Sequence, residues 1–198
     1  MVLGIALTAA RAPAQPARGG DPDWPCKQIK VPTIALAQYW PGAPLDPAQI
    51  SGRSDAQIAE LAARLAARRT TMEEAGKLIA AFAGGAGAQR KEKLELLALA
   101  TFERLSAERS EVVSGLERFG GKLRAMADRL RAEGDNLRAA QDASPQDAAK
   151  VRDLTEKIQW DVRVFDERKQ ALTYVCETPQ LIEQRLGAIE RLIAAAMS

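Results

Sequence analysis

The feature that most constrains the fold is an unusually long helical pattern over residues 88–141. Apolar residues recur through it at helical spacing, with one threonine among them: Leu94, Leu97, Thr101, Leu105, Val112, Leu116, Phe119, Leu123, Met126, Leu130 and Leu137. From Leu116 onward the steps alternate between three and four residues, and Glu133 fills the one slot without an apolar side chain. Such alternation is the seam of a coiled coil. About 54 helical residues would extend roughly 80 Å, far beyond the helices of ordinary compact domains.

A second heptad pattern follows the turn at residues 142–147 and predicts a return helix. Ser144 is a good N-cap and Pro145 a good first helical residue, so we expect the helix to start there. Its seam consists of Val151, Leu154, Ile158, Asp161, Phe165, Leu172 and Val175. Thr178-Pro179 predicts a restart or a kink. The last helical stretch carries Leu181, Ile182, Leu186, Ile189 and Ile193.

The two patterns together predict an antiparallel hairpin. With the tip centred on the turn, facing residues have numbers that sum to about 286. This register sets Phe119 near Phe165, Met126 near Trp160, and Gly120-Gly121 beside Phe165. Each glycine inside a helix costs about 1 kcal/mol relative to alanine, so the four in this pattern, Gly115, Gly120, Gly121 and Gly134, need a reason. Room for a bulky neighbour is one explanation, and a hinge in the hairpin is the other.

Two short helices precede the hairpin. Ser54 opens the first with a capping box, and Thr70-Thr71 opens the second, which Gly84-Gly85 ends. Both are too short to cover arms of such length, so they complete a four-helix bundle only near the open end, and the tip half projects. The predicted fold is all-α: residues 54–198 form a long antiparallel coiled-coil hairpin with a small helical bundle at its base.

Residues 15–53 predict an extended Pro-rich strap that lies across the helices. They hold seven of the ten prolines, which exclude a regular helix. They also hold Trp24, Tyr39 and Trp40, and large aromatic side chains argue against a free linker. Asp21 and Asp23 suggest a metal site only weakly, and a solvated turn is the simpler interpretation.

The only cysteines are Cys26, in the strap, and Cys176, in the return helix. Two cysteines in an exported chain predict one disulfide, which would staple the strap to the bundle. A reactive or metal-binding pair is the alternative. It lacks a Cys-x-x-Cys motif and any histidine that could complete a site.

Residues 1–14 resemble a signal peptide, because the apolar run Val2–Ala10 precedes a small-x-small site at Ala12–Ala14. The run is too short to span a bilayer, and no stable membrane insertion is expected. A basic segment is missing before it, which leaves open a start upstream of Met1. The alternative is an alanine-rich leader on a cytosolic protein. We expect a periplasmic or secreted protein.

A second stripe on the return helix lies off the seam. Its members are Trp160, Val164, Ala171 and Tyr174. A two-helix coil cannot bury them, so either the strap covers them or a partner docks there. Strap residues Lys27–Ile34 are long enough to reach Trp160 from a bond at Cys176.

Enzymatic chemistry is not expected, and neither is a cofactor. The chain has no histidine, and no nucleophile motif or phosphate loop is present. A net charge of +2 with interspersed signs gives no basic block for nucleic acid.

Two functional hypotheses follow from the sequence. The first is a periplasmic interaction protein, an adaptor or chaperone-like helical hairpin that binds another protein. Homo-oligomers are compatible with it. The second is a module that holds a small ligand or cation between the strap and the helices. The residues involved would be Asp21, Asp23, Trp24, Trp40 and Trp160.

Overall fold

The computed structural model describes residues 21–45 and 55–197, and it confirms the all-α hairpin with a small bundle at its base. The predicted leader over residues 1–14 and the predicted cap Ser54 lie outside the described residues. Its helical elements, in chain order, are η1 Leu36–Gln38, α2 Ala56–Ala66, α3 Met72–Gly85, η2 Gly87–Gln89, α4 Arg90–Asp142 and α5 Ala148–Ala195.

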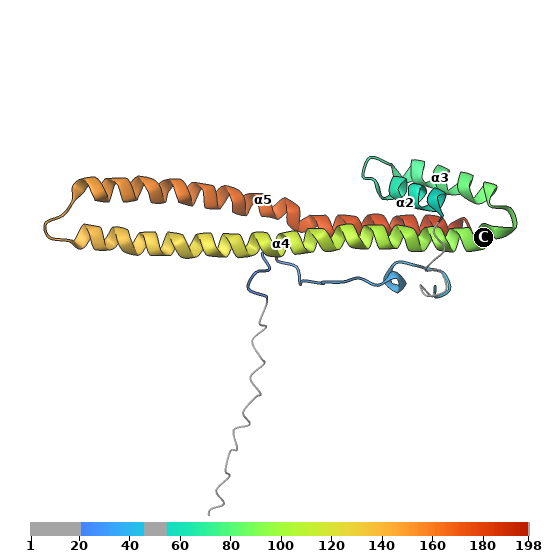
Figure 1. Ribbon diagram of the computed structural model, residues 1–198, viewed down its shortest axis with the longest axis horizontal. Coiled ribbons are helices and arrows are strands. Elements are labelled where there is room, and N and C mark those ends of the chain that lie inside the picture. The colour runs from blue at the N-terminus through green and yellow to red at the C-terminus, as the bar shows by residue number, and fades with distance from the viewer. Residues whose placement is uncertain (1–20, 46–54, 198) are drawn as a thin grey trace, which may run out of the picture.

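α4 and α5 lie antiparallel along their whole length and form a rod (Figure 1). The predicted seam of α4 faces inward, because Leu116, Leu123 and Met126 are buried. The two acidic seam positions meet one cation: Lys157 forms ion pairs with Glu133 of α4 and, at 2.8 Å, with Asp161 of its own helix. This pair of hydrogen bonds raises the pKa of Lys157, with the bond to Asp161 the larger cause. A polar layer of this kind favours one register over others.

The return helix starts later than predicted. Its N-cap is Asp147, whose carboxylate accepts a hydrogen bond from the Lys150 amide at 3.0 Å, so Ser144 and Pro145 belong to the turn. The tip is therefore centred near residue 145 and not near 143. Aspartate caps a helix as well as serine does, so both starts satisfy the same rule.

The later start shifts the register, so Met126 does not face Trp160 as predicted. Phe119 and Phe165 are displaced along the hairpin from the predicted pairing, although both pack against the same apolar cluster. Arg168 reaches the sulfur of Met126 instead, and Phe119 lies against the segment around Leu172. Moving the centre of an antiparallel pair by two residues changes the sum of facing residue numbers by four. One misplaced cap therefore displaced the predicted facing pairs along the hairpin.

Of the two alternatives predicted at Pro179, a restart and a kink, α5 has no restart, and one seam position of α5 differs from the prediction. The helix continues through Pro179, and Figure 1 shows a bend midway along α5 without a restart. A proline inside a helix removes one backbone hydrogen bond and kinks it. Val175 is half-exposed, and its neighbour Cys176 takes the buried seam position.

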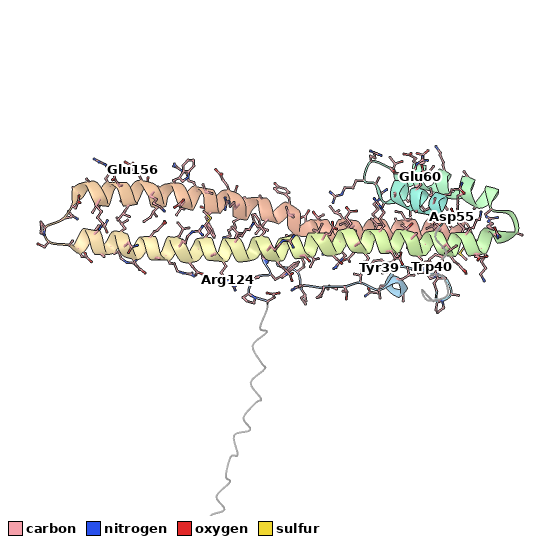
Figure 2. The ribbon with its side chains drawn as sticks, in the orientation of Figure 1. Tyr39, Trp40, Asp55, Glu60, Arg124 and Glu156 are labelled. Atoms are coloured by element: carbon pink, nitrogen blue, oxygen red, sulfur yellow. A yellow bond between two sulfur atoms is a disulfide. The ribbon has the colours of Figure 1, made fainter. Side chains whose placement is uncertain are left out.

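The base of the hairpin is a four-helix bundle, with α2 and α3 packed on α4 and α5. Asp55 caps α2 in place of the predicted Ser54, and Thr71 caps α3 as predicted. Arg185 of α5 donates hydrogen bonds to the carbonyl oxygens of Leu65 and Thr70. These bonds satisfy free carbonyl groups where α2 ends. Figure 2 shows Asp55 and Glu60 on this side of the rod.

The strap, residues 21–45, runs along the opposite side of the rod from α2 and α3 (Figure 1). Its first residues cross α4 at Gly120, where an added Cβ would collide with the Asp23 carbonyl oxygen and lie 3.0 Å from the Pro25 ring. Of the two explanations for this glycine, the structure supports room for a close neighbour. The neighbour is the backbone of the strap and not Phe165.

Candidate functional site

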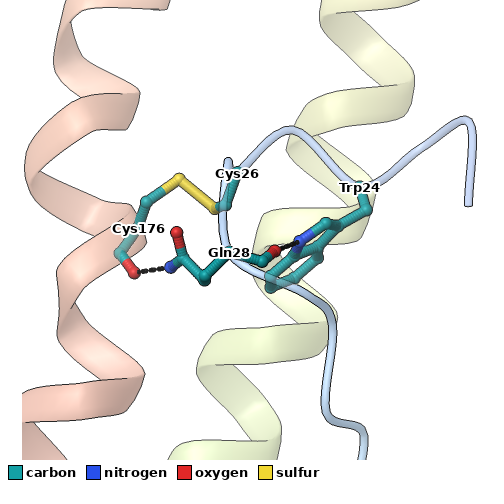
Figure 3. The surroundings of a disulfide bond; sticks show 4 residues. All are labelled: Trp24, Cys26, Gln28 and Cys176. Atoms are coloured by element: carbon teal, nitrogen blue, oxygen red, sulfur yellow. Dashed lines mark hydrogen bonds between the residues drawn. A yellow bond between two sulfur atoms is a disulfide. The ribbon is translucent and has the colours of Figure 1, made fainter. Parts of the chain in front are cut away.

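A disulfide joins the strap to α5 in the middle of the rod. Cys26 and Cys176 are bonded with their Cα atoms 5.6 Å apart, as predicted (Figure 3). Gln28 adds a hydrogen bond to the Cys176 carbonyl oxygen, and the Trp24 indole nitrogen donates to the Gln28 carbonyl oxygen at 2.7 Å. Beneath them lies a small apolar cluster of Leu116, Leu123, Leu172 and Cys176.

The acidic turn at the start of the strap binds basic side chains. Lys30 pairs with Asp21 at 2.6 Å and also with Glu117 of α4. The hydrogen bond from Lys30 is the main reason that the pKa of Asp21 lies below its usual value. Asp23 pairs with Arg124 of α4 at 2.7 Å, and Figure 2 shows Arg124 beside the strap. Both carboxylates that suggested a cation site thus contact cationic side chains.

Farther along, a buried arginine connects the strap with both long helices. Arg109 of α4 is 3% exposed, and its Nε lies 2.5 Å from the Glu183 carboxylate of α5. Its guanidinium also contacts the Pro32 carbonyl oxygen at 3.4 Å. Burial and a hydrogen bond to Glu183 raise the pKa of Tyr39 to about 12. Sequence reasoning missed this network, because a lone arginine in a charged helix looks like a surface residue.

The two strap tryptophans that we considered for binding have internal roles here. Trp24 packs over the disulfide cluster with its indole hydrogen bonded. Trp40 is 7% exposed, belongs to the bundle core, and donates from its indole nitrogen to the Ala43 carbonyl oxygen at 2.8 Å. The structure does not bring either of them to Trp160, which lies in the projecting half of α5.

The predicted second stripe is open to solvent on α5. Leu181, which the prediction did not include, extends it toward the base, and we call the whole set the outer face: Trp160, Val164, Ala171, Tyr174 and Leu181. Trp160 is 61% exposed, Tyr174 79% and Leu181 56%. The Arg163 guanidinium lies 5.5 Å from the centre of the Trp160 ring, a cation–π arrangement. These residues follow one another in steps of three, four or seven along one helical face.

The strap does not cover the outer face. From Cys26 it runs toward the base of the hairpin, where Tyr39 and Trp40 lie (Figure 2), and not toward Trp160. The expectation that Lys27–Ile34 covers Trp160 is therefore wrong. The reach was sufficient, but the disulfide fixes only one point of the strap and not its direction, which the burial of Trp40 determines.

An apolar groove lies between α4 and α5 beside the outer face. Its volume is about 310 Å³, and it is lined by Val112, Gly115, Leu116, Phe119, Ala171, Leu172 and Val175. The heptad pattern marked several of these residues as core. The groove itself could not be found from the sequence, because it depends on the register and on the missing side chain at Gly115.

One buried acid was not predicted from the sequence. Glu190 of α5 is fully buried, and within residues 21–45 and 55–197 neither carboxylate oxygen has a hydrogen-bond partner. Burial raises its pKa to about 8. Thr101 of α4 is also fully buried, and its hydroxyl has no partner among the described residues.

Comparisons with known proteins leave the geometry as the only guide to function: no protein-family model, curated protein or solved structure matches this chain. In the described part of the chain, no helix has both the length and the apolarity needed to cross a membrane. Within the same residues, no three potential metal-ligating side chains are grouped to hold an ion.

Proposed function

We propose that this chain is a non-enzymatic interaction protein, an adaptor or chaperone-like helical hairpin, that binds another protein through the outer face of α5. One observation carries the proposal: Trp160, Tyr174 and Leu181 are all more than half exposed on a single helical face. Aromatic residues that lie in line on an exposed helix are typical of docking surfaces.

The strap supports this role by leaving the outer face free and holding the hairpin from its other side. The disulfide between Cys26 and Cys176, the Asp23–Arg124 ion pair and the buried Arg109 fasten it to both long helices. A rod stiffened in this way presents its exposed side chains in a fixed arrangement. Such preorganisation lowers the entropy lost on binding.

The proposed location is the periplasm or another oxidising compartment. The disulfide is the supporting observation, because such bonds persist in exported proteins and are rare in reducing compartments. The small-ligand or cation hypothesis has less support. Asp21 and Asp23 contact Lys30 and Arg124, and the three tryptophans lie in separate parts of the fold.

Site-specific photo-crosslinking in the native host tests the proposal. A photoreactive phenylalanine analogue replaces Tyr174 in one variant and Thr173, its exposed neighbour on a different face of α5, in the other. We expect one discrete protein adduct from position 174 and none from position 173. The same adduct pattern at both positions, or none at either, would contradict the proposed face.

A further inference from the structure

The groove continues a surface on which the chain already packs a helix of its own. Arg68, just after α2, pairs with Glu108 of α4 at 3.6 Å, and Val112, the first groove residue, lies one helical turn farther toward the tip. Val112 packs against the bundle core and also against the disulfide cluster. The apolar surface under α2 is therefore continuous with the groove.

On α5 the same continuity holds. Arg185, which binds the end of α2, shares a helical face with Leu181, Tyr174 and Ala171, because these positions differ by steps of three, four or seven residues. The stretch from Leu181 to Trp160 is about 30 Å long. One amphipathic helix of four to six turns matches that length.

A second copy of the chain fits this surface poorly. α2 and α3 pack on the rod at its base (Figure 1), and Arg185, which binds the end of α2, shares a helical face with Leu181 of the outer face. A second hairpin laid flush along the groove would extend about 70 Å or more and would meet those helices, whichever way it pointed. A single short helix avoids them.

The charges around the groove indicate the charge of the side chains that such a helix would present. Arg118 lies at the groove wall, with its Nη2 atom 3.8 Å from the position of a Cβ on Gly115. Lys122 lies one turn farther along α4, and Arg168 lies one heptad before Val175 on α5. None of these three cations has an acidic partner among the described residues. Two acids share the spacing of the outer face: Glu167 lies in this part of it, and Glu177 lies nearer the base, between Tyr174 and Leu181. Positive charge is therefore in excess on the side of the groove toward the tip.

We infer that the groove and the outer face bind one amphipathic helix of a partner protein, with acidic residues toward the tip of the hairpin. The inference rests on the proposed function and specifies its partner. The leucine-type side chains of the helix fill the groove between Val112 and Phe119, as those of α2 pack on the bundle core. Its carboxylates pair with Arg118, Lys122 and Arg168, which gives the contact its direction and its specificity.

Gly115 provides a variant that blocks the groove without breaking the fold. A Cβ there would meet only the flexible end of Arg118. Gly115→Leu therefore places a side chain in the groove while it improves helix propensity. Gly134→Leu is the matched control, because Gly134 lies in the same helix with nothing within 4 Å of an added Cβ.

The test uses two fluorescent helical peptides of about 18 residues with the same leucine stripe. One carries glutamate beside the stripe and the other carries lysine. In anisotropy titrations of the full chain, we expect the glutamate peptide to bind at least about tenfold more tightly. Gly115→Leu should weaken its binding by a similar factor, and Gly134→Leu should not change it. The double reversal Arg118→Glu with Lys122→Glu should invert the preference.

Several results would overturn the inference. The first is equal affinity of the chain for the two peptides, and the second is unchanged affinity of the Gly115→Leu variant for the glutamate peptide. The third is a dimer in solution that Gly115→Leu converts to a monomer, because a second copy would then be the occupant of the groove. If neither peptide binds while position 174 still forms its protein adduct, the inference fails and the proposed function stands. If the glutamate peptide binds as described but no adduct forms in the host, the helix site stands and the proposed function fails.

Discussion

The Asp23 carbonyl oxygen lies where a side chain on Gly120 would begin, so the strap crosses α4 where the helix has no Cβ in its path. Asp23 is held there by Arg124, one turn farther along the same helix. The glycine and the arginine together fix where the strap begins its crossing.

We predict that Gly120→Ala destabilises the protein although alanine favours helices. The added Cβ must displace the strap backbone, and overpacking of this kind costs about 1–3 kcal/mol. Gly134→Ala is the control, and it should stabilise by up to about 1 kcal/mol. Urea unfolding of both variants measures the difference. If both substitutions stabilise equally, the strap does not pass over Gly120.

We predict that the oxidised protein contains no free thiol and that Cys176→Ser lowers the melting temperature. The disulfide closes a loop across a sequence separation of 150 residues. In the loop-entropy model such a closure contributes about 5 kcal/mol. Thiol titration under denaturing conditions, with and without reductant, gives the number of free thiols. Two reactive thiols without reductant would refute the bond.

Stability should fall as pH rises from about 4.5 to 8, because of Glu190. Burial raises the pKa of this carboxyl from 4.5 to about 8 in the folded protein. Between these values the folded state keeps a proton that the unfolded state releases, so stability is greatest at the low end and is lost as pH rises. The loss approaches about 1.4 kcal/mol per pH unit.

Glu190→Gln should remove that slope, and Glu156→Gln, at an exposed position of α5, should preserve it. Denaturant melts from pH 5 to 8.5 compare the three proteins. A wild-type curve parallel to that of Glu190→Gln over this range would mean that the carboxyl is ionised in the folded state.

Truncation to alanine should change the stability of the protein very differently at two tryptophans. Trp40 is in the bundle core, so Trp40→Ala should cost about 3–5 kcal/mol. Trp160 contacts Arg163 and is mostly exposed, so Trp160→Ala should leave the melting temperature nearly unchanged. Thermal melts of the two variants and the wild type measure both effects. A large loss for Trp160→Ala would show that some part of the chain covers the outer face.

The sequence predicted the long helices, the disulfide and the presence of a second apolar stripe on α5, because heptad spacing and cysteine number are local or countable signals. It did not decide whether the strap covers that stripe. It misplaced the register, because Ser144 and Asp147 are equally good caps and the choice depends on how the arms pack. It also left the direction of the strap open, which the burial of Trp40 in the bundle decides.

The polar network could not be predicted for a different reason. Arg109, Glu183 and Arg185 each lie in helices rich in charge, where most charged side chains are solvated. Arg109 contacts the strap at Pro32 and Glu183 on α5, and Arg185 binds carbonyl groups at and after the end of α2, so both depend on tertiary packing that the sequence does not show. The groove could not be predicted either, because it depends on the register that places Gly115 of α4 opposite Ala171 of α5.

The most direct test of the proposed docking face is the affinity of the purified chain for the protein that crosslinks at position 174. Exposed aromatic anchors contribute about 2 kcal/mol or more each when they are hot spots. We therefore predict that Tyr174→Ala weakens binding by at least about thirtyfold, while Thr173→Ala changes it little, as measured by titration calorimetry. Equal affinities for the wild type and Tyr174→Ala would contradict the proposal that the outer face of α5 binds the partner.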